Sequence, residues 1–204
     1  MIDIRGLYKS FEDKTVLSNI NASFENGKTN LIIGQSGSGK TVLMKCIVGL
    51  LTPEKGEVLY DGRNLVLMGK KEKKMLRKEM GMIFQSAALF DSMSVLDNVM
   101  FPLNMFSNDT LRDRTKRAMF CLERVNLTEA KDKFPGEISG GMQKRVAIAR
   151  AIALNPQYLF CDEPNSGLDP KTSLVIDDLI HDITQEYNIC LLYTSPSPRD
   201  RTRS

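Results

Sequence analysis

Eight residues, GQSGSGKT at positions 34–41, constrain the fold of this chain more than any other feature. They match the pattern G-x-x-x-x-G-K-[ST], in which glycines let backbone N–H groups curl around phosphate oxygens. The apolar runs LII before the pattern and TVLMKCIVGLL after it predict a strand, a loop and a helix. Lys40 can then reach the β- and γ-phosphates of a nucleotide, and the Thr41 hydroxyl can bind Mg²⁺. The predicted phosphate-binding residues are Gly34, Ser36, Gly37, Ser38, Gly39, Lys40 and Thr41.

A second predicted element carries two acids. The run YLFCDE, residues 158–163, is an apolar strand that ends in Asp162 and Glu163. Ligands of open α/β sheets lie at the carboxyl ends of the strands, so these carboxylates are expected beside the phosphates. Asp162 suits a Mg²⁺ role, and Glu163 suits orientation and deprotonation of an attacking water. An apolar run that ends in Asp-Glu is common by chance, so it has weight only beside the phosphate loop.

The composition limits the other classes of function. The 204 residues fit one compact domain with a sizeable core, and 26% charged against 42% hydrophobic residues argues against disorder. A net charge of +3 is too small to indicate nucleic-acid binding. No apolar run approaches the ~20 residues of a membrane-spanning helix. Four cysteines without CxxC spacing favour a reducing cytoplasm and argue against a zinc site. The basic run KKEKKMLRKE is more typical of a solvated helix face than of a membrane or RNA patch.

The order of the predicted elements indicates an α/β fold. Alternating or continuous apolar residues and Asn-Gly or Asp-Gly turns predict strands over residues 20–24, 31–34 and 56–60. Apolar residues at helical spacing predict helices over residues 111–125, 141–154 and 171–187. Strands come first and helices dominate the middle, with the acidic strand between two helices.

A second glycine-rich segment, ISGGMQ at residues 138–143, precedes a predicted helix. Together with the phosphate loop, Gln85 in MIFQS, the acidic strand and NSGLD at residues 165–169, it completes an ordered set of five motifs. In this order the chain resembles the ATP-binding cassette (ABC) family over residues 1–189. The resemblance implies a P-loop NTPase α/β core with an antiparallel β layer and a helical subdomain near residues 86–150. It also implies ATP and Mg²⁺ as cofactors and hydrolysis of ATP to ADP and phosphate.

The resemblance implies roles for individual residues. Phe11 stands where the family places an aromatic that stacks on adenine, although a core phenylalanine at a strand edge fits nearly as well. Gln85 resembles the glutamine that contacts Mg²⁺ and water and senses the membrane subunit. Asp169 matches the loop that crosses the interface between two subunits. The family signature, which closes on the γ-phosphate of ATP held by the opposite subunit, is matched by Ser139, Gly140 and Gly141.

Within the family, residues 87–95 and the string GGMQKR look most similar to the ATPase of Mla-type bacterial phospholipid transporters, which have MCE-domain partners. The resemblance implies a head-to-tail homodimer that sandwiches two ATP–Mg²⁺ and binds integral-membrane permease subunits. It places the protein at the cytoplasmic face of the inner membrane, as a peripheral subunit without nucleic acid. The apolar, Met-rich stretch 89–106 is either a groove for a permease helix or plain subdomain core. Another ABC importer is the alternative assignment.

A non-catalytic ATP-binding module also stays open. Family cassettes place a catalytic histidine about 33 residues beyond the acid that corresponds to Glu163, at the end of the next strand of a βαβ unit. That count ends near Pro196, where the chain has no histidine. The only histidine, His181, is expected on the polar face of a helix beside Asp178 and Asp182. The resemblance therefore implies a fragment that binds ATP but hydrolyses it poorly.

The string CLLYTSPSPRD, residues 190–200, resembles a translated transposase sequencing adapter. A genuine disordered tail of the same composition is the alternative. We expect residues 190–204 to be non-native, and the natural gene to continue beyond Ile189 with a strand, the histidine and further helices. The chain should then be a C-terminally truncated cassette that lacks the end of its sheet and exposes apolar surface. Residues 190–193 are apolar enough for part of a strand, which Pro196 and Pro198 should end.

Overall fold

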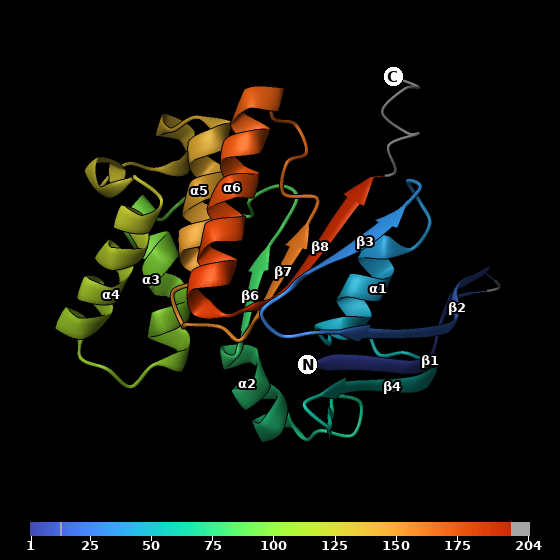
Figure 1. The fold of residues 1–204 in the computed structure, drawn as a ribbon. Coiled ribbons are helices and arrows are strands. Elements are labelled where there is room, and N and C mark those ends of the chain that lie inside the picture. The colour runs from blue at the N-terminus through green and yellow to red at the C-terminus, as the bar shows by residue number, and fades with distance from the viewer. Residues whose placement is uncertain (13, 197–204) are drawn as a thin grey trace.

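The computed structural model of the chain describes residues 1–12 and 14–196. Figure 1 shows two β-sheets, a helix packed between them, and a group of helices on the other face of the parallel sheet. The antiparallel sheet has the strand order β2-β1-β4-β5, and the parallel sheet has the order β3-β8-β7-β6. This is an α/β core with an antiparallel layer and a helical layer, as the sequence predicts.

The antiparallel sheet is built around a long hairpin at the N-terminus. The alternation of apolar and polar residues buries Ile2 and Ile4 on one face of the hairpin. The Asp61-Gly62 pair turns the chain between the last two strands, with both residues at positive φ. The strands are β1 (Ile2–Phe11), β2 (Lys14–Phe24), β4 (Lys55–Tyr60) and β5 (Arg63–Asn64).

The parallel sheet carries the predicted phosphate and acid motifs at the carboxyl ends of its strands. Side chains of its strand β7 alternate between two cores: Tyr158 and Phe160 face the antiparallel side, whereas Leu159 and Cys161 face the helical side. Burial on both faces explains why this strand reads as a continuous apolar run. The strands are β3 (Thr29–Gly34), β6 (Met80–Ile83), β7 (Tyr158–Asp162) and β8 (Cys190–Pro196).

Strand β8 corrects one expectation from the sequence. The sheet does not lose its end, because β8 is an interior strand that pairs in parallel with β3 on one side and β7 on the other. Cys190, Leu191 and Leu192 are buried, and apolar side chains on both faces are what such a strand requires. The strand ends at Pro196, and the remaining tail, Pro198 included, lies outside the described residues. Any apolar β-forming segment of this length meets these requirements.

The edge strand β3 agrees with the expected exposure of apolar surface. Leu31 is 52% exposed and Ile33 is 57% exposed, although both belong to a strand of the central sheet. Among the described strands, β3 has a hydrogen-bonded neighbour on one side only, which is β8.

Helix α1 (Lys40–Ile47) lies between the two sheets in Figure 1. Its buried face, with Met44 and Ile47, packs in one core with apolar residues of both sheets. The Tyr60 hydroxyl donates a hydrogen bond of 2.8 Å to the backbone oxygen of Ile47, and the Tyr60 and Tyr158 rings meet edge to face. These contacts hold α1, and the loop before it, against the parallel sheet.

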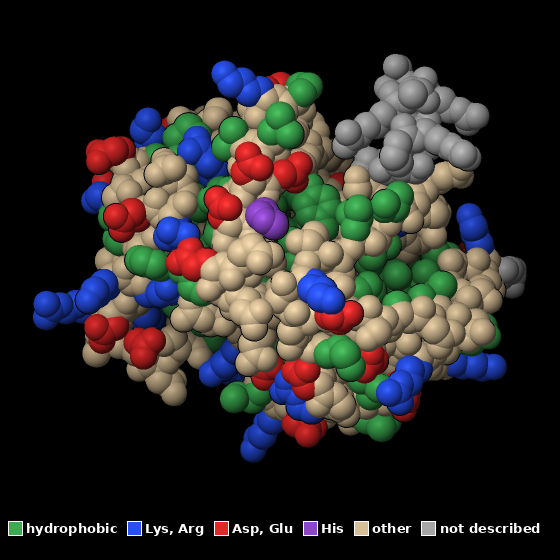
Figure 2. All heavy atoms as spheres, viewed as in Figure 1, with side chains coloured by type: hydrophobic (Ala, Val, Ile, Leu, Met, Phe, Trp, Pro, Cys, Tyr) green, Lys and Arg blue, Asp and Glu red, His purple; other side chains and the backbone are tan. Residues whose placement is uncertain are grey.

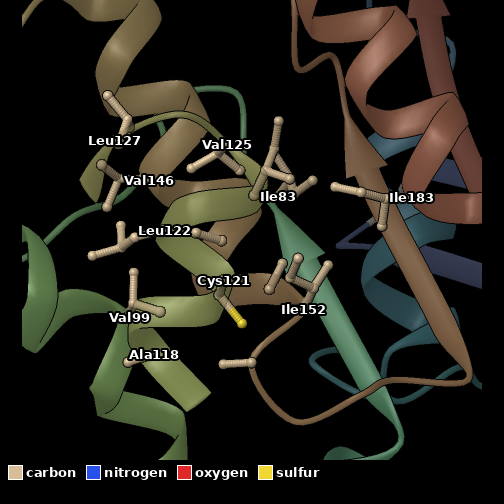
Figure 3. Packing of buried hydrophobic residues seen from close by; sticks show 14 of the residues in the cluster. Ile83, Val99, Ala118, Cys121, Leu122, Val125, Leu127, Val146, Ile152 and Ile183 are labelled. Atoms are coloured by element: carbon tan, nitrogen blue, oxygen red, sulfur yellow. The ribbon is translucent and has the colours of Figure 1, made fainter. Parts of the chain in front are cut away.

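The helical layer packs on the opposite face of the parallel sheet. Figure 3 shows Val99, Cys121, Leu122 and Val146 of three helices converging near Ile83 of β6. Ser94, Thr110 and Ser139 cap the helices α3, α4 and α5 through their hydroxyl groups. The elements are α3 (Val95–Phe106), α4 (Leu111–Arg124), the 3-10 turns η1 (Thr128–Ala130) and η2 (Pro135–Glu137), α5 (Gly140–Ala151) and α6 (Pro170–Tyr187).

Helix α2 (Lys70–Lys78) is the predicted basic helix, and it lies below the start of β6 in Figure 1. Only Leu76 of this helix is buried, so most of its lysines face solvent. Across the described ranges, we find no helix with both the length and the apolar character needed to cross a bilayer.

Candidate nucleotide site

The phosphate loop connects β3 to α1, as the sequence predicts. Gly37 has a φ of 77° and Gly39 a φ of 93°, values that residues with a Cβ rarely adopt. Gly39 is constrained twice, because a Cβ there would lie 3.0 Å from a Val16 methyl group of β2. Glycine at these positions therefore lets the loop turn under the β1–β2 hairpin into the N-terminus of α1, where backbone N–H groups favour anions.

Lys40 lies inside the loop. Its side chain is 7% exposed, and its ammonium group donates to the backbone oxygens of Gly34 at 2.8 Å and Gln35 at 3.1 Å. The same nitrogen is 3.6 Å from a carboxylate oxygen of Glu163. The phosphate loop and the acidic strand, which are about 120 residues apart in the sequence, thus meet at one cation.

The acid pair, Asp162 and Glu163, lies at the carboxyl end of β7. Asp162 accepts a hydrogen bond from the Thr41 hydroxyl at 3.4 Å and from the Thr194 hydroxyl at 2.8 Å. Glu163 has a φ of 47°, and its backbone N–H donates to the Thr194 oxygen at 3.1 Å. One buried hydroxyl, that of Thr194, therefore links both acids to strand β8.

The donor set fits Mg²⁺. A threonine hydroxyl and a carboxylate within hydrogen-bond distance of each other are hard oxygen donors, which this ion prefers. Among the described residues, no group of three or more His, Cys, Asp or Glu side chains could by itself hold a metal ion. A Mg²⁺ ion at Thr41 and Asp162 would therefore need further oxygen ligands from water and nucleotide phosphates, the usual coordination of this ion.

A hollow of about 480 Å³ opens beside the acid pair. Tyr193 and Asn165 both donate to Asp177 of α6 at 2.7 Å, and these three side chains form one wall. Glu163 lines the same hollow, together with Ser166, Thr194 and Ser195 at the end of β8. The carboxylate of Glu163 thus borders both Lys40 and an open space that is large enough for water.

Gln85 follows β6 and lies near the acid pair through Ser166. Its side-chain amide donates to the Ser166 hydroxyl at 2.8 Å, and its backbone oxygen accepts from the ammonium group of Lys144 on α5. Lys144 is 5% exposed, and this burial lowers the pKa of its ammonium group. Gln85 itself is exposed, as a residue that contacts a ligand requires.

The serine–glycine turn, made of Ser139, Gly140 and Gly141, begins α5 at a different hollow of about 550 Å³. The Ser139 hydroxyl accepts from the Met142 N–H at 3.3 Å and caps the helix. Asp169 lines the same hollow and caps α6, accepting from the backbone of Lys171 and Thr172. The Thr172 hydroxyl, above all, lowers the pKa of the Asp169 carboxyl.

The two glycine-rich segments do not form one site within the chain. Helix α1 packs in the core with Phe160, and α5 packs in the core with Leu159 on the other face of the sheet. Figure 1 shows α1 and α5 on opposite sides of β7. A ligand that contacts both segments therefore needs a second copy of one of them.

Phe11 and His181 lie on the surface. Phe11 ends β1, is 43% exposed and has the Lys9 ammonium 5.2 Å from its ring centre. Phe11 is therefore a surface residue, and the alternative of a core phenylalanine is wrong. His181 is exposed on α6, and acidic side chains gather around the single histidine in Figure 2. Its position on a solvated helix face agrees with the expectation from the sequence.

An apolar groove of about 540 Å³ runs along the outer side of β6. Met80 and Met82 of β6 form one side, and Phe101 and Pro102 of α3 form the other. The Phe90 and Phe101 rings are 4.6 Å apart, and Phe90 is 40% exposed. Part of the Met-rich stretch 89–106 thus lines a groove, while Val95, Val99 and Leu103 are core.

The sequence did not single out Thr194 and Ser166, which lie at the site, or the two cations of α5 beside the Gln85 loop, Lys144 and Arg150. Thr194 was assigned to a non-native tail, and its contact with Asp162 depends on pairing between strands 32 residues apart. Lys144 and Arg150 lie in the helix predicted over residues 141–154, and no role was predicted for either. One signal was available: the run KRVAIARAIAL is apolar except for three cations, Lys144, Arg145 and Arg150, and cations are uncommon in such a run.

Comparisons with known proteins agree with this geometry. The model of the family described as ABC transporter matches residues 17–166. The chain is 39% identical over 191 residues to the probable ribonucleotide transport ATP-binding protein mkl of Mycobacterium leprae, covering 94% of this chain and 55% of that protein. It is 39% identical over 194 residues to the methionine import ATP-binding protein MetN of Legionella pneumophila, covering 94% and 56%. The chain thus spans about half the length of these curated relatives.

A third relative is shorter. The chain is 39% identical over 195 residues to the intermembrane phospholipid transport system ATP-binding protein MlaF of Haemophilus influenzae, covering 96% of this chain and 74% of that protein. Among solved structures, the dimeric structure of the bacterial ABC transporter cassette MJ0796 superposes with a TM-score of 0.87 at 31% identity, covering 96% and 88%. A post-hydrolysis dimer of the same cassette, bound to ADP and Pi, gives 0.85 at 30% identity, covering 97% and 88%.

Proposed function

Because this chain belongs to the ABC transporter family, we propose that it is the subunit that binds and hydrolyses ATP for a bacterial membrane transporter. The observation that carries the proposal is the meeting of the phosphate loop and the acid pair, with the Lys40 ammonium 3.6 Å from Glu163. We assign residues 1–189 to the ATPase domain, with a helical subdomain near residues 86–150, and residues 190–204 to a non-native tail.

Each residue of this site has a chemical role in the proposal. The backbone of the phosphate loop and Lys40 hold the β- and γ-phosphates, and the Phe11 ring stacks on adenine. Thr41, Asp162 and Gln85 hold Mg²⁺, which neutralises charge on the phosphate oxygens. Glu163 orients the attacking water and accepts its proton, which becomes possible when phosphate oxygens replace the carboxylate as the partner of Lys40.

The proposal requires a second subunit. The serine–glycine turn presents a helix N-terminus and a capping hydroxyl beside Asp169, away from the phosphate loop of its own chain. A head-to-tail dimer with two-fold symmetry would place each turn against the γ-phosphate held by the partner. The apolar groove along β6 is then the surface for a short permease helix, and it gives the subunit a peripheral place on the cytoplasmic face of the inner membrane.

Phospholipid is the cargo that we propose, with an MCE-domain protein among the partners. The relative MlaF supports this assignment because its name specifies intermembrane phospholipid transport and the chain covers most of its length. A second candidate is another importer, which the methionine and ribonucleotide relatives favour at the same identity. The genes beside the coding sequence discriminate the two: permease and MCE-domain genes support phospholipid, whereas a gene for a periplasmic methionine-binding protein supports the second candidate. The same locus shows which codons follow Ile189.

Titration with ATP tests the proposed site directly. Lys40→Ala removes the cation that contacts the phosphates, and we expect the affinity for ATP to fall at least about tenfold, with the fold intact. Lys45→Ala, which removes an exposed lysine from the same helix, is the matched control and should bind as the unaltered chain does. Equal affinity of the Lys40→Ala and unaltered chains would show that the phosphate-loop assignment is wrong.

A further inference from the structure

The loop that carries Gln85, residues 84–89, has an unusual backbone. Ala87 has a φ of 59° and Ala88 a φ of 49°, so two consecutive alanines adopt the left-handed region. A Cβ makes this region unfavourable, and such conformations persist only where the surroundings determine them strongly. The Gln85 loop therefore needs partners that hold its backbone.

Helix α5 provides these partners through two cations. The guanidinium of Arg150 donates to the backbone oxygen of Ala88 at 2.7 Å and to that of Ala87 at 2.8 Å. Closer to the N-terminus of the same helix, the ammonium group of Lys144 donates to the backbone oxygen of Gln85. Two cations thus bind three of four consecutive carbonyl groups, through charge-assisted hydrogen bonds that are stronger than neutral ones.

These cations have no other ionic partner among the described residues. Lys144 is buried, and burial lowers the pKa of both Lys144 and Arg150. A desolvated cation without a carboxylate is costly, so its hydrogen bonds to the loop carbonyls are its main compensation. Loop and helix therefore stabilise each other.

Helix α5 begins at the serine–glycine turn, and Gln85 contacts Ser166 three residues beyond Glu163. Ala88 and Arg150 also line the apolar groove along β6. The contacts of the two cations thus lie between three places: the acid pair, the N-terminus of α5 and the groove. We propose that Lys144 and Arg150 are positioning residues that lock the Gln85 loop to α5, so that Gln85 and the serine–glycine turn move as one body.

This inference rests on the proposed function for its consequence. A protein segment that docks in the groove would displace Ala88 and Arg150. The hydrogen bonds between α5 and the Gln85 loop would transmit this displacement to Gln85, the proposed Mg²⁺ ligand. Groove and nucleotide site are then coupled through a defined mechanical element rather than through general flexibility.

Amide hydrogen exchange tests the lock without any nucleotide. Arg150→Gln removes the fork that binds two carbonyls, and we expect amides of residues 85–89 to exchange about tenfold faster. Lys144→Met, which keeps an unbranched side chain without the charge, should accelerate exchange in the same segment. Arg117→Gln is the matched control, because Arg117 binds the backbone oxygens of Ile152 and Ala153, just beyond the C-terminal end of α5. That variant should leave exchange in residues 85–89 unchanged.

The second measurement is the Mg²⁺ dependence of ATP affinity, which a general loss of stability would not change selectively. In EDTA, Arg150→Gln and Lys144→Met should bind ATP with the affinity of the unaltered chain. The increase in ATP affinity that Mg²⁺ provides should be at least about fivefold smaller in these variants than in the unaltered chain. Gln85→Ala sets the size of this loss. Unchanged loop exchange and unchanged Mg²⁺ dependence in Lys144→Met, the milder variant, would overturn the proposal even if Arg150→Gln fails to fold. Failure of the unaltered chain to bind ATP would contradict the proposed function, while the exchange data would still test the lock.

Discussion

The phosphate loop and the serine–glycine turn are both glycine-rich segments that begin a helix, yet their surroundings differ. Within its own chain, the phosphate loop folds over Lys40, meets Glu163 and is covered by Val16 of the hairpin. The serine–glycine turn is open at Gly140, where a Cβ would meet no atom within 4 Å, whereas a Cβ on Gly141 would lie 2.9 Å from the Thr172 methyl group. The difference supports the proposal that the phosphate loop binds nucleotide within its own chain and that the serine–glycine turn completes the site of a second copy.

The largest effect is expected from a larger side chain in the serine–glycine turn. A Cβ at Gly140 meets no atom of its own chain within 4 Å, and Gly140→Asp is expected to place a carboxylate where a partner's γ-phosphate would lie. ATP binding to the single chain should remain unchanged, whereas the affinity of ATP-dependent dimerisation should fall about 30-fold or more. Sedimentation with and without ATP measures this loss. Gly136→Asp, at another glycine with open space, is the control; equal behaviour of the two variants would place the turn outside the interface.

A smaller change is expected at the end of β8. Thr194 pairs with Asp162, so Ser195 lies at the level of Glu163 and lines the same hollow. The family resemblance implies a histidine near this place, one residue before the position that counting gives. Ser195→His should therefore raise the steady-state ATPase rate about tenfold, because positioning supplies much of the rate enhancement in phosphoryl transfer. An unchanged or lower rate in a folded variant would contradict the proposal that a missing histidine limits turnover.

The smallest effect concerns the hydroxyl that links the acid pair to β8. Thr194→Val keeps the shape of the side chain but leaves the Glu163 N–H and an Asp162 carboxylate oxygen without this partner. The free energy of unfolding should fall by about 1 to 3 kcal/mol, and the gain in ATP affinity from Mg²⁺ should fall several-fold. Thr194→Ser should restore both, and denaturant titration with and without MgATP checks the pair. Full stability in the valine variant would show that the hydroxyl is dispensable.

The phosphate loop and the acid pair were more predictable from the sequence than the contacts that surround them. The phosphate loop is a local motif whose glycines fix the backbone, so strand, loop and helix follow from consecutive residues. The acid pair was likewise found from its apolar strand and the order of motifs. The roles of Thr194, Lys144 and Arg150 depend on contacts between distant segments, which no local pattern specifies. The expected loss of the sheet end was wrong because Cys190, Leu191 and Leu192 satisfy the burial of an interior strand whatever their origin.

The mass of the Glu163→Gln chain with saturating MgATP tests the central claim most directly. The amide keeps the shape of the carboxylate but cannot accept the proton from water, so an ATP-bound dimer should persist rather than turn over. Light scattering after size exclusion should give twice the chain mass of 22.9 kDa, which is 45.8 kDa, and the additional change Gly140→Asp should return it to 22.9 kDa. A mass of 22.9 kDa for Glu163→Gln with ATP bound to every phosphate loop would contradict the claim that two chains complete the site.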